Sequence, residues 1–278
     1  MSVPRKNRWK PPLIAAVVLA GIAVPTTAIA TQPATTDAPA RDTAAGAHAY
    51  DDAYYKDAEG KTGAELKKAL HTIISKQDKL SYDEVWDALK TTDEDPKNSS
   101  NVILLYSGRS QSKESNGPGE NEWNREHVWA KSHGDFGTST GPGTDLHHLR
   151  PEDCTVNSIR GNKDFDAGGD EVPEAKGNRT DDDSFEPRDE VKGDVARMIL
   201  YMAVRYDGEE SFPDLEPNDQ VDNGSKPNIG RLSVLKQWSK QDAPDAFEKK
   251  RNEVIYDKFQ HNRNPFIDHP EWVDDIWK

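Results

Sequence analysis

The sequence contains a single cysteine, Cys154, among 278 residues. A chain with one thiol forms no internal disulfide bond, so its stability has to come from a packed core and from bound cations. A lone cysteine is more often buried and chemically inert than activated as a nucleophile. We therefore interpret Cys154 as a structural residue, with a nucleophilic role as the alternative.

Positive charge is also scarce, since 36 Lys and Arg residues stand against 50 Asp and Glu residues, for a net charge of −14. Lys and Arg supply the affinity of proteins for polyanions such as nucleic acid. This composition argues against a protein that packages DNA over its whole surface. It is compatible with a soluble secreted enzyme that holds a cation and contacts its substrate through a local basic groove.

The apolar run from Leu13 to Val24 is short for a helix that spans a bilayer. The small-x-small triplet Ala28-Ile29-Ala30 follows it. Four basic residues precede the apolar run, namely Arg5, Lys6, Arg8 and Lys10. This order is typical of a secretory signal peptide cleaved after Ala30, and an uncleaved single-span anchor is the alternative. Cleavage removes four positive charges and no acidic ones, which leaves −14 − 4 = −18.

The remaining sequence predicts a linker and one folded domain. Residues 31–50 are rich in Ala, Thr, Pro and Asp and have few large apolar side chains, as in flexible linkers. No internal repeat or second linker follows. We therefore predict a signal peptide at 1–30, a flexible linker at 31–50 and one domain of the α+β class at 51–278.

Apolar periodicity predicts helices over 63–79, 155–162, 193–206 and 230–260, with a break at Asp242-Ala243-Pro244. A further helix starts at Ser81, where Glu84 completes a capping box, and it presents Val85, Trp86 and Leu89 as its apolar face. The run from Asn101 to Tyr106 predicts a buried strand. Residues 108–143 are expected to form a long polar loop, and residues 170–189 an acidic surface loop.

Four of the eight histidines fall within 22 residues, at His127, His133, His147 and His148. Oxygen ligands are interleaved with them or follow closely, namely Glu126, Asp135, Asp145, Glu152, Asp153 and Asn157. This density predicts a metal-assisted hydrolytic centre, with solvated loop residues as the alternative. The histidine spacing does not match a zinc site, and Glu-His reverses the order of the H-E-x-x-H motif. Carboxylate and amide oxygens fit Mg²⁺ better.

Two segments carry a resemblance to a known family, NREHVWAKSHG at 124–134 and DLHHLRPEDCTVNSIRGNKDF at 145–165. They resemble the bacterial endonuclease I family of periplasmic and extracellular nucleases. The similarity extends to LSYDEVWDALKTTDEDP at 80–96, KGDVARMILYMAVRYDG at 192–208 and NRNPFIDHPEWV at 262–273. It therefore covers nearly the whole chain beyond the linker.

The resemblance implies a mixed helical domain around a ββα-metal (His-Me finger) nuclease core, in which a β-hairpin, a loop and a helix hold one divalent ion. It implies His127 as the general base, with Glu126 and Asn157 as the metal ligands. Neutral imidazole can accept a proton near pH 7, which suits this role. Adjacent residues of a regular strand face opposite sides, so Glu126 and His127 converge only if the backbone bends there.

An arginine near the phosphate is expected to stabilise the charge of the transition state. The candidates are Arg125, Arg150, Arg160 and Arg179. We place Arg160 first, as a catalytic residue, because it lies three residues beyond Asn157 on about the same helical face, with a structural salt bridge as the alternative. Asp145 and His147 are expected to orient the hairpin or contact His127.

Other polar residues have structural interpretations. His133 and His148 are expected to pack the loop. The segment 262–270 is read as a packing element that lines the substrate groove. The run Asp181-Asp182-Asp183 is expected to be solvated, with a Ca²⁺ site as the alternative.

Together these features predict a secreted, monomeric endonuclease that depends on Mg²⁺, with Mn²⁺ or Ca²⁺ as substitutes, and has no membrane association after signal cleavage. Its substrate is nucleic acid, DNA or RNA or both, cut with little sequence specificity because phosphate contacts carry no sequence information. The alternatives are a metal-dependent phosphoesterase of small substrates and a noncatalytic secreted binding protein.

Overall fold

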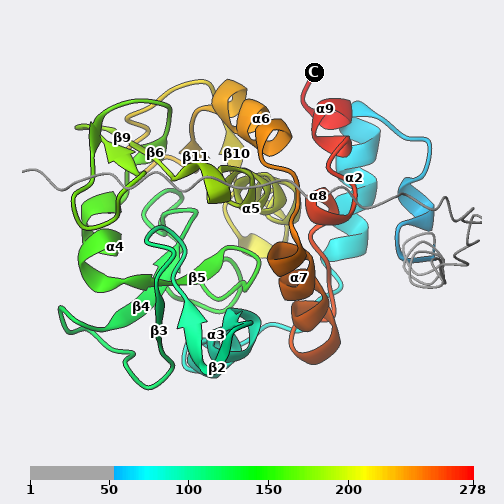
Figure 1. Ribbon diagram of the computed structural model, residues 1–278. Coiled ribbons are helices and arrows are strands. Elements are labelled where there is room, and N and C mark those ends of the chain that lie inside the picture. Colours follow the sequence, from blue (N-terminus) through cyan, green and yellow to red (C-terminus); the bar gives the residue numbers. More distant parts are fainter. Residues whose placement is uncertain (1–52) are drawn as a thin grey trace, which may run out of the picture. The chain divides into compact units, whose positions relative to one another are not determined.

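The computed structural model describes residues 53–278, so the predicted signal peptide and linker lie outside the described residues. Helices and small sheets alternate along the described chain, which confirms the α+β prediction (Figure 1). The α-helices are α2 (Gly63–Ile74), α3 (Glu84–Thr92), α4 (Cys154–Arg160), α5 (Lys192–Arg205), α6 (Leu232–Gln241), α7 (Ala246–Lys258), α8 (Pro265–Asp268) and α9 (Trp272–Ile276). Short 3-10 helices are η1 (Lys56–Ala58), η2 (Asp189–Val191) and η3 (Glu209–Ser211).

The strands form small sheets. They are β1 (Glu94–Asp95), β2 (Asn98–Ile103), β3 (Ser110–Ser112), β4 (Trp123–His127), β5 (Leu149–Asp153), β6 (Asp164–Phe165), β7 (Asp170–Glu171), β8 (Arg179–Thr180), β9 (Ser184–Glu186), β10 (Glu216–Pro217) and β11 (Asn228–Ile229). In the described residues their orders are β1-β2-β3, β4-β5, β6-β9-β8-β7 and β10-β11. No helix of the described residues is long and apolar enough to cross a membrane.

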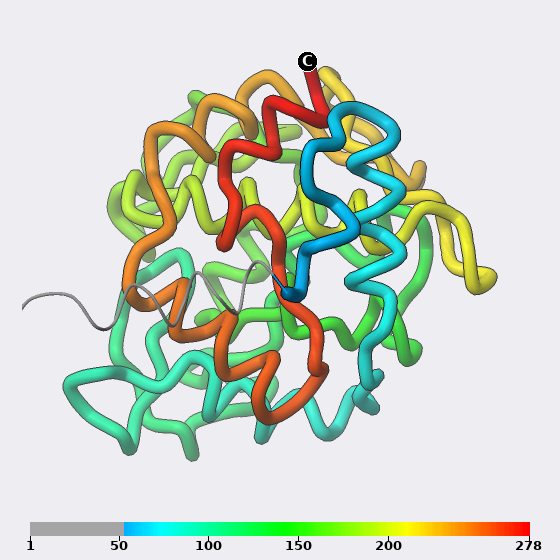
Figure 2. Tube along the Cα trace, turned by 90° about the vertical axis from the view of Figure 1, so that its right-hand side faces the viewer, coloured from blue at the N-terminus to red at the C-terminus, as the bar shows by residue number. Residues whose placement is uncertain are grey.

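Helix α5 forms the centre of the larger hydrophobic core. Every residue from Gly193 to Arg205 is buried, because apolar side chains such as Val195, Ile199 and Met202 pack against neighbours on several sides. Helices α2, α6 and α8 pack against it. The C-terminal helix α9 lies beside α2, so the two ends of the described chain meet on this side (Figure 2).

A smaller core lies between α3, α7 and the strand pair β4-β5. It contains Val85, Leu89, Trp123, Leu149 and Ile255, all fully buried. The capping-box contacts predicted before α3 are present, since the backbone N–H of Ser81 donates to Glu84 at 2.7 Å. The helix itself begins at Glu84.

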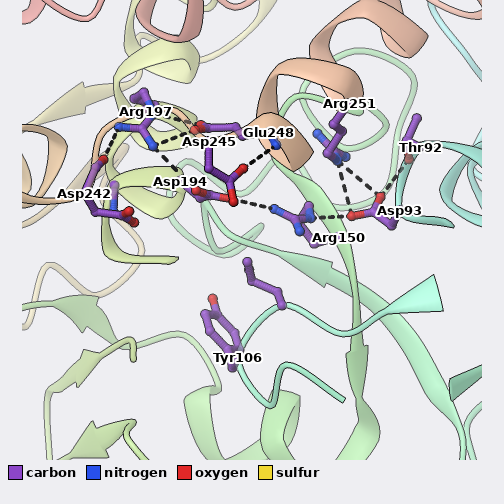
Figure 3. Close-up of polar contacts among 12 residues, drawn as sticks. Thr92, Asp93, Tyr106, Arg150, Asp194, Arg197, Asp242, Asp245, Glu248 and Arg251 are labelled. Atoms are coloured by element: carbon purple, nitrogen blue, oxygen red, sulfur yellow. Dashed lines mark hydrogen bonds and ion pairs between the residues drawn. The ribbon is translucent and has the colours of Figure 1, made fainter. Parts of the chain in front are cut away.

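A buried network of charges connects β5 with helices α3, α5 and α7 (Figure 3). Arg150 of β5 donates to Asp93 at 2.5 Å and lies 3.5 Å from Asp194. The network continues through Arg197, Glu248 and Arg251. Buried charges are costly without partners, so this network fixes where β5 lies against the helices.

The strands β4 and β5 and the helix α4 form a ββα unit. The strands pair antiparallel, with Glu126 opposite Arg150. Helix α4 follows β5 directly because the Asp153 carboxylate caps its first turn by accepting two backbone N–H groups. The helix ends where Gly161 adopts φ of 59°. This unit has the strand–strand–helix order that the resemblance implied.

Three sequence-based predictions were wrong in their local detail. The predicted polar loop at 108–143 contains β3 and β4, whose polar side chains hide the strand pattern because several of them line a pocket. The acidic segment 170–189 contributes β7, β8 and β9 to a sheet. The buried strand expected at 101–106 is instead a strand at Asn98–Ile103 in which Val102 is buried and the first three residues are exposed, and the buried residues 104–106 follow it.

We predict that Arg150→Ala lowers the free energy of unfolding by about 3 kcal/mol or more, because it leaves Asp93 and Asp194 buried with fewer partners. Urea denaturation measures the change. Lys240→Ala, which removes an exposed ion pair with Asp274, is the control and is expected to cost less than about 1 kcal/mol. Equal losses in the two variants would show that the network does not stabilise the fold.

Candidate active site

A pocket of about 460 Å³ opens where β4 ends and α4 passes beside it. Glu126, His127, Asn157 and Arg160 all line this pocket. The first two are the last residues of β4, and the other two lie on α4. The structure therefore brings together at one pocket the four residues that the sequence singled out.

Glu126 is only 1 % exposed, and its partners come from two other segments. The Tyr106 hydroxyl donates to its Oε1 at 2.8 Å, and Arg160 Nη1 lies 3.3 Å from the same oxygen. Burial raises the pKa of Glu126 to about 7, although Arg160 and Tyr106 act in the opposite direction. The ionised form of this carboxylate therefore depends more on nearby positive charge than that of a solvated carboxylate.

His127 is buried at the end of β4, and its ring centre lies 5.9 Å from that of Tyr82 and 5.6 Å from that of His148. Its Nε2 lies 3.1 Å from the carbonyl oxygen of Gly143. A carbonyl only accepts, so Nε2 carries the hydrogen and Nδ1 keeps the basic lone pair. Burial, with a smaller effect of His148, holds the pKa of His127 well below its usual value, so the ring is neutral at pH 7.

Asn157 connects α4 to β4. Its Nδ2 donates to Asn124 Oδ1 at 2.6 Å, which leaves the amide oxygen of Asn157 as an acceptor at the half-buried pocket wall. Together with the buried Glu126 carboxylate this gives one charged and one neutral oxygen donor. Such a pair fits a Mg²⁺-like ion that keeps several water ligands.

Arg160 is 1 % exposed and makes most of its contacts with β4. Its Nη1 and Nη2 donate to the carbonyls of His127 and Val128 at 2.9 and 2.7 Å, in addition to the ion pair with Glu126. The salt bridge that the sequence left as an alternative is therefore present. These contacts hold the end of the strand and one carboxylate oxygen of Glu126 in place.

The other candidate arginines lie in different places. Arg150 belongs to the buried charge network, and Arg179 is exposed on β8. Neither lines the pocket. Arg125 does, next to Tyr82 and Trp86, and the pocket wall also includes Lys131.

The loop at 128–148 is anchored by residues that were expected nearer the chemistry. Asp145 accepts from the hydroxyls of Tyr201 and Tyr206, both at 2.9 Å, and His147 Nε2 lies 3.1 Å from Asn262 Oδ1. Their hydrogen bonds go to these groups and not to His127. They act on it indirectly, because the loop they anchor supplies the Gly143 carbonyl.

The remaining sequence candidates are structural in their contacts. His133 lies between the carbonyls of Asn228 and Asn162, and His148 Nε2 donates to Pro142. Segment 262–270 packs against α2, α5 and α7 and does not line the pocket. Cys154 is buried in the first turn of α4, and burial raises the pKa of its thiol.

Another group of ligand-type side chains lies outside this pocket. His71 of α2 has Asp207 and Glu209 at 3.5 and 3.4 Å from its ring nitrogens, so the three could approach one ion. Its Nδ1 is 2.9 Å from the Val204 carbonyl, and the Glu209 side chain is largely exposed. This arrangement is that of a histidine with two acidic neighbours at the protein surface.

Sequence reasoning missed Tyr106, Tyr82 and Trp86 as parts of the site. Tyr106 ends an apolar run and was assigned to a buried strand, and Trp86 was assigned to an apolar helix face. The spacing of Tyr82 and Trp86, four residues apart at the start of a helix, places both on one side and was the available signal. Which pocket that side faces is decided by contacts across the fold.

The sequence of the chain is similar to those of known proteins over most of its length. The sequence profile of Endonuclease I matches residues 62–271. The chain is 66% identical over 224 residues to an extracellular ribonuclease of Bacillus amyloliquefaciens, covering 81% of this chain and 78% of the relative. It is 65% identical over 233 residues to an extracellular ribonuclease of Bacillus subtilis (strain 168), covering 84% and 81% respectively.

We predict that Glu126→Gln changes the pH dependence of stability in metal-free protein. The folded-state pKa of about 7 lies above the ordinary value of 4.5, so the folded form keeps the proton longer. The stability that Glu126 contributes is complete below about pH 4.5 and is lost as pH rises through 7, by about 3 kcal/mol. Glutamine does not ionise, so the stability of the variant does not fall with pH for this reason.

Urea denaturation in EDTA at several pH values measures the difference between parent and variant. Glu120→Gln, at an exposed carboxylate in the nearby loop, is the matched control. A parent–variant difference that stays constant between pH 4.5 and 8 would contradict the burial of this charge.

Proposed function

The chain belongs to the endonuclease I family and is an endonuclease that hydrolyses phosphodiester bonds. On this basis we propose that it is a secreted enzyme that uses one Mg²⁺ ion and His127 to cut RNA and DNA. Secretion is supported by the relatives, which are extracellular, and by the predicted signal peptide. RNA as a substrate is supported by their description as ribonucleases.

One observation carries the proposal. Glu126, His127 and Asn157 come from a strand end and a helix, yet they line a single pocket. A buried carboxylate, a neutral imidazole and an amide oxygen are the groups that metal-assisted hydrolysis needs. Among the described residues that line the pocket, Glu126 is the one carboxylate, beside Arg125, Lys131 and Arg160, which suits a polyanionic substrate.

Glu126 and Asn157 would hold the ion through their side-chain oxygens. When bound, Mg²⁺ would neutralise charge on the scissile phosphate and stabilise the leaving oxygen. The donor set supports this assignment because burial has already made the Glu126 carboxylate costly to ionise without a cation. Mn²⁺ and Ca²⁺ take the same oxygen donors and are expected to compete for the site.

His127 would remove the proton from the attacking water at Nδ1. The Gly143 carbonyl keeps the hydrogen on Nε2, and the neutral ring is ready to accept a proton at pH 7. Arg160 would position this centre, because it donates to the main chain of His127 and pairs with Glu126. Its expected contact with the substrate phosphate stays a prediction.

We expect the secreted protein to cut plasmid DNA and ribosomal RNA in Mg²⁺ and to lose this activity in EDTA. His127→Ala is expected to lower the rate by about 10²–10⁴-fold, because a general base supplies an acceleration of that size. His261→Asn, at an exposed histidine outside the pocket, is the control. Gel assays on single-stranded DNA, duplex DNA and RNA side by side give the substrate preference.

Two results would contradict this proposal. Polymers that stay intact in Mg²⁺ would favour the alternative of a phosphoesterase for small substrates. Unchanged cleavage by His127→Ala would remove His127 as the base.

A further inference from the structure

Among the cations of the pocket, Arg125 differs from Arg160 in its partners. Arg160 is engaged with two carbonyls and the Glu126 carboxylate. Within residues 53–278, no carboxylate lies within ion-pair distance of Arg125, although the charge of Asp83 acts on it from further away. Its hydrogen bonds go to Tyr82, from Nη1 to the main-chain carbonyl and also to the side chain. Its Nε, like that of Arg160, is buried without a hydrogen-bond partner, so the two residues differ in the partners of their terminal nitrogens. Arg125 is therefore a partly buried cation with donors still available.

Two aromatic rings hold the Arg125 guanidinium in place. Its central carbon lies 3.4 Å from the ring centre of Tyr82 and 4.1 Å from that of Trp86. Stacking on aromatic rings fixes the plane of a guanidinium and leaves the N–H groups at its edge free. Trp86 is itself supported by Trp123, whose ring centre lies 5.3 Å away.

The stacked guanidinium lies close to the reacting groups. Arg125 precedes Glu126 in β4, and both line the same pocket. The ring of Tyr82 contacts the guanidinium on the one hand and lies 5.9 Å from the ring of His127 on the other. Arg125 thus lies in the wall of the same pocket that a substrate strand would enter to reach His127.

We propose that Arg125, stacked on Tyr82 and Trp86, forms a binding subsite for a backbone phosphate of the nucleic-acid substrate next to the reacting centre. The inference rests on the proposed function. A planar, weakly hydrated guanidinium with a free edge matches the geometry of phosphate oxygens. The two rings act as supports for the cation and not as a stacking surface for a base, because the guanidinium covers a face of each.

The subsite also accounts for how an acidic protein binds a polyanion. With a net charge of −14, the chain has no general attraction for nucleic acid. A guanidinium that no carboxylate neutralises concentrates positive charge where it is needed. Its contacts with phosphate are independent of the base, so they preserve the low sequence specificity.

The test measures binding to a fluorescein-labelled single-stranded RNA and to a labelled DNA duplex, both in EDTA. All proteins carry His127→Ala, so the substrate stays intact. Dissociation constants from fluorescence anisotropy are plotted against salt concentration on logarithmic axes. Arg125→Ala is expected to weaken binding about tenfold and to reduce the slope by about 0.7 for the single strand and about 0.9 for the duplex, the values for one lost phosphate contact.

Two further variants separate the subsite from general effects. Trp86→Leu keeps the charge but loosens the guanidinium, so affinity is expected to fall while the salt slope stays unchanged. Arg179→Ala removes the same charge from an exposed site outside the pocket and is expected to change neither. Circular dichroism and thermal unfolding confirm that each variant is folded.

An unchanged salt slope in Arg125→Ala would overturn the subsite, as would an equal loss of slope in Arg179→Ala. Either result leaves the proposed function standing if the parent enzyme cuts nucleic acid and His127→Ala does not. Failure of the proposed function appears separately, as intact polymer with the parent enzyme.

Discussion

The burial of the Glu126 carboxylate is the constraint on which the site depends. A carboxylate without water needs donors and positive charge, and Tyr106 and Arg160 supply them from segments on either side of β4. Arg160 can do so because α4 starts immediately after β5, with Asp153 as its cap. The register of β4 with β5 in turn places Glu126 opposite Arg150, which the buried charge network holds. Local structure, packing and the position of the reacting groups thus share one set of contacts.

How far the sequence predicts this molecule depends on the range of the interactions involved. The apolar periodicity of α5 and the capping box before α3 are local signals, and both correspond to features of the structure. Strand β4 gave no such signal, because its polar residues serve the pocket and not a hydrophobic face. The role of Tyr106 and the Gly143 carbonyl beside His127 depend on long-range contacts that no local pattern contains. The resemblance supplied the candidate residues, and the fold supplied their partners.

Charge is distributed so that an acidic chain keeps a basic pocket. Most carboxylates lie elsewhere, and the pocket combines Glu126 with three cations that have different surroundings. Arg160 donates to the carbonyls of His127 and Val128 and pairs with Glu126, Lys131 is exposed, and Arg125 is stacked on two rings. A cation whose charge and N–H donors are already used by protein groups has few donors available for a substrate, whereas a cation stacked on aromatic rings keeps its N–H donors available. On this difference we base the proposal that Arg125 binds a phosphate, while the phosphate contact of Arg160 stays a prediction.

The central claim is that Glu126 and Asn157 together hold one divalent ion. Titration of Mn²⁺ followed by electron paramagnetic resonance counts bound ions directly, without substrate. We expect Glu126→Gln and Asn157→Ala each to lose one ion per chain relative to the parent, while His261→Ala, at an exposed histidine outside the pocket, keeps it. Mn²⁺ binding of the same stoichiometry and affinity in the parent and in both pocket variants would contradict the account.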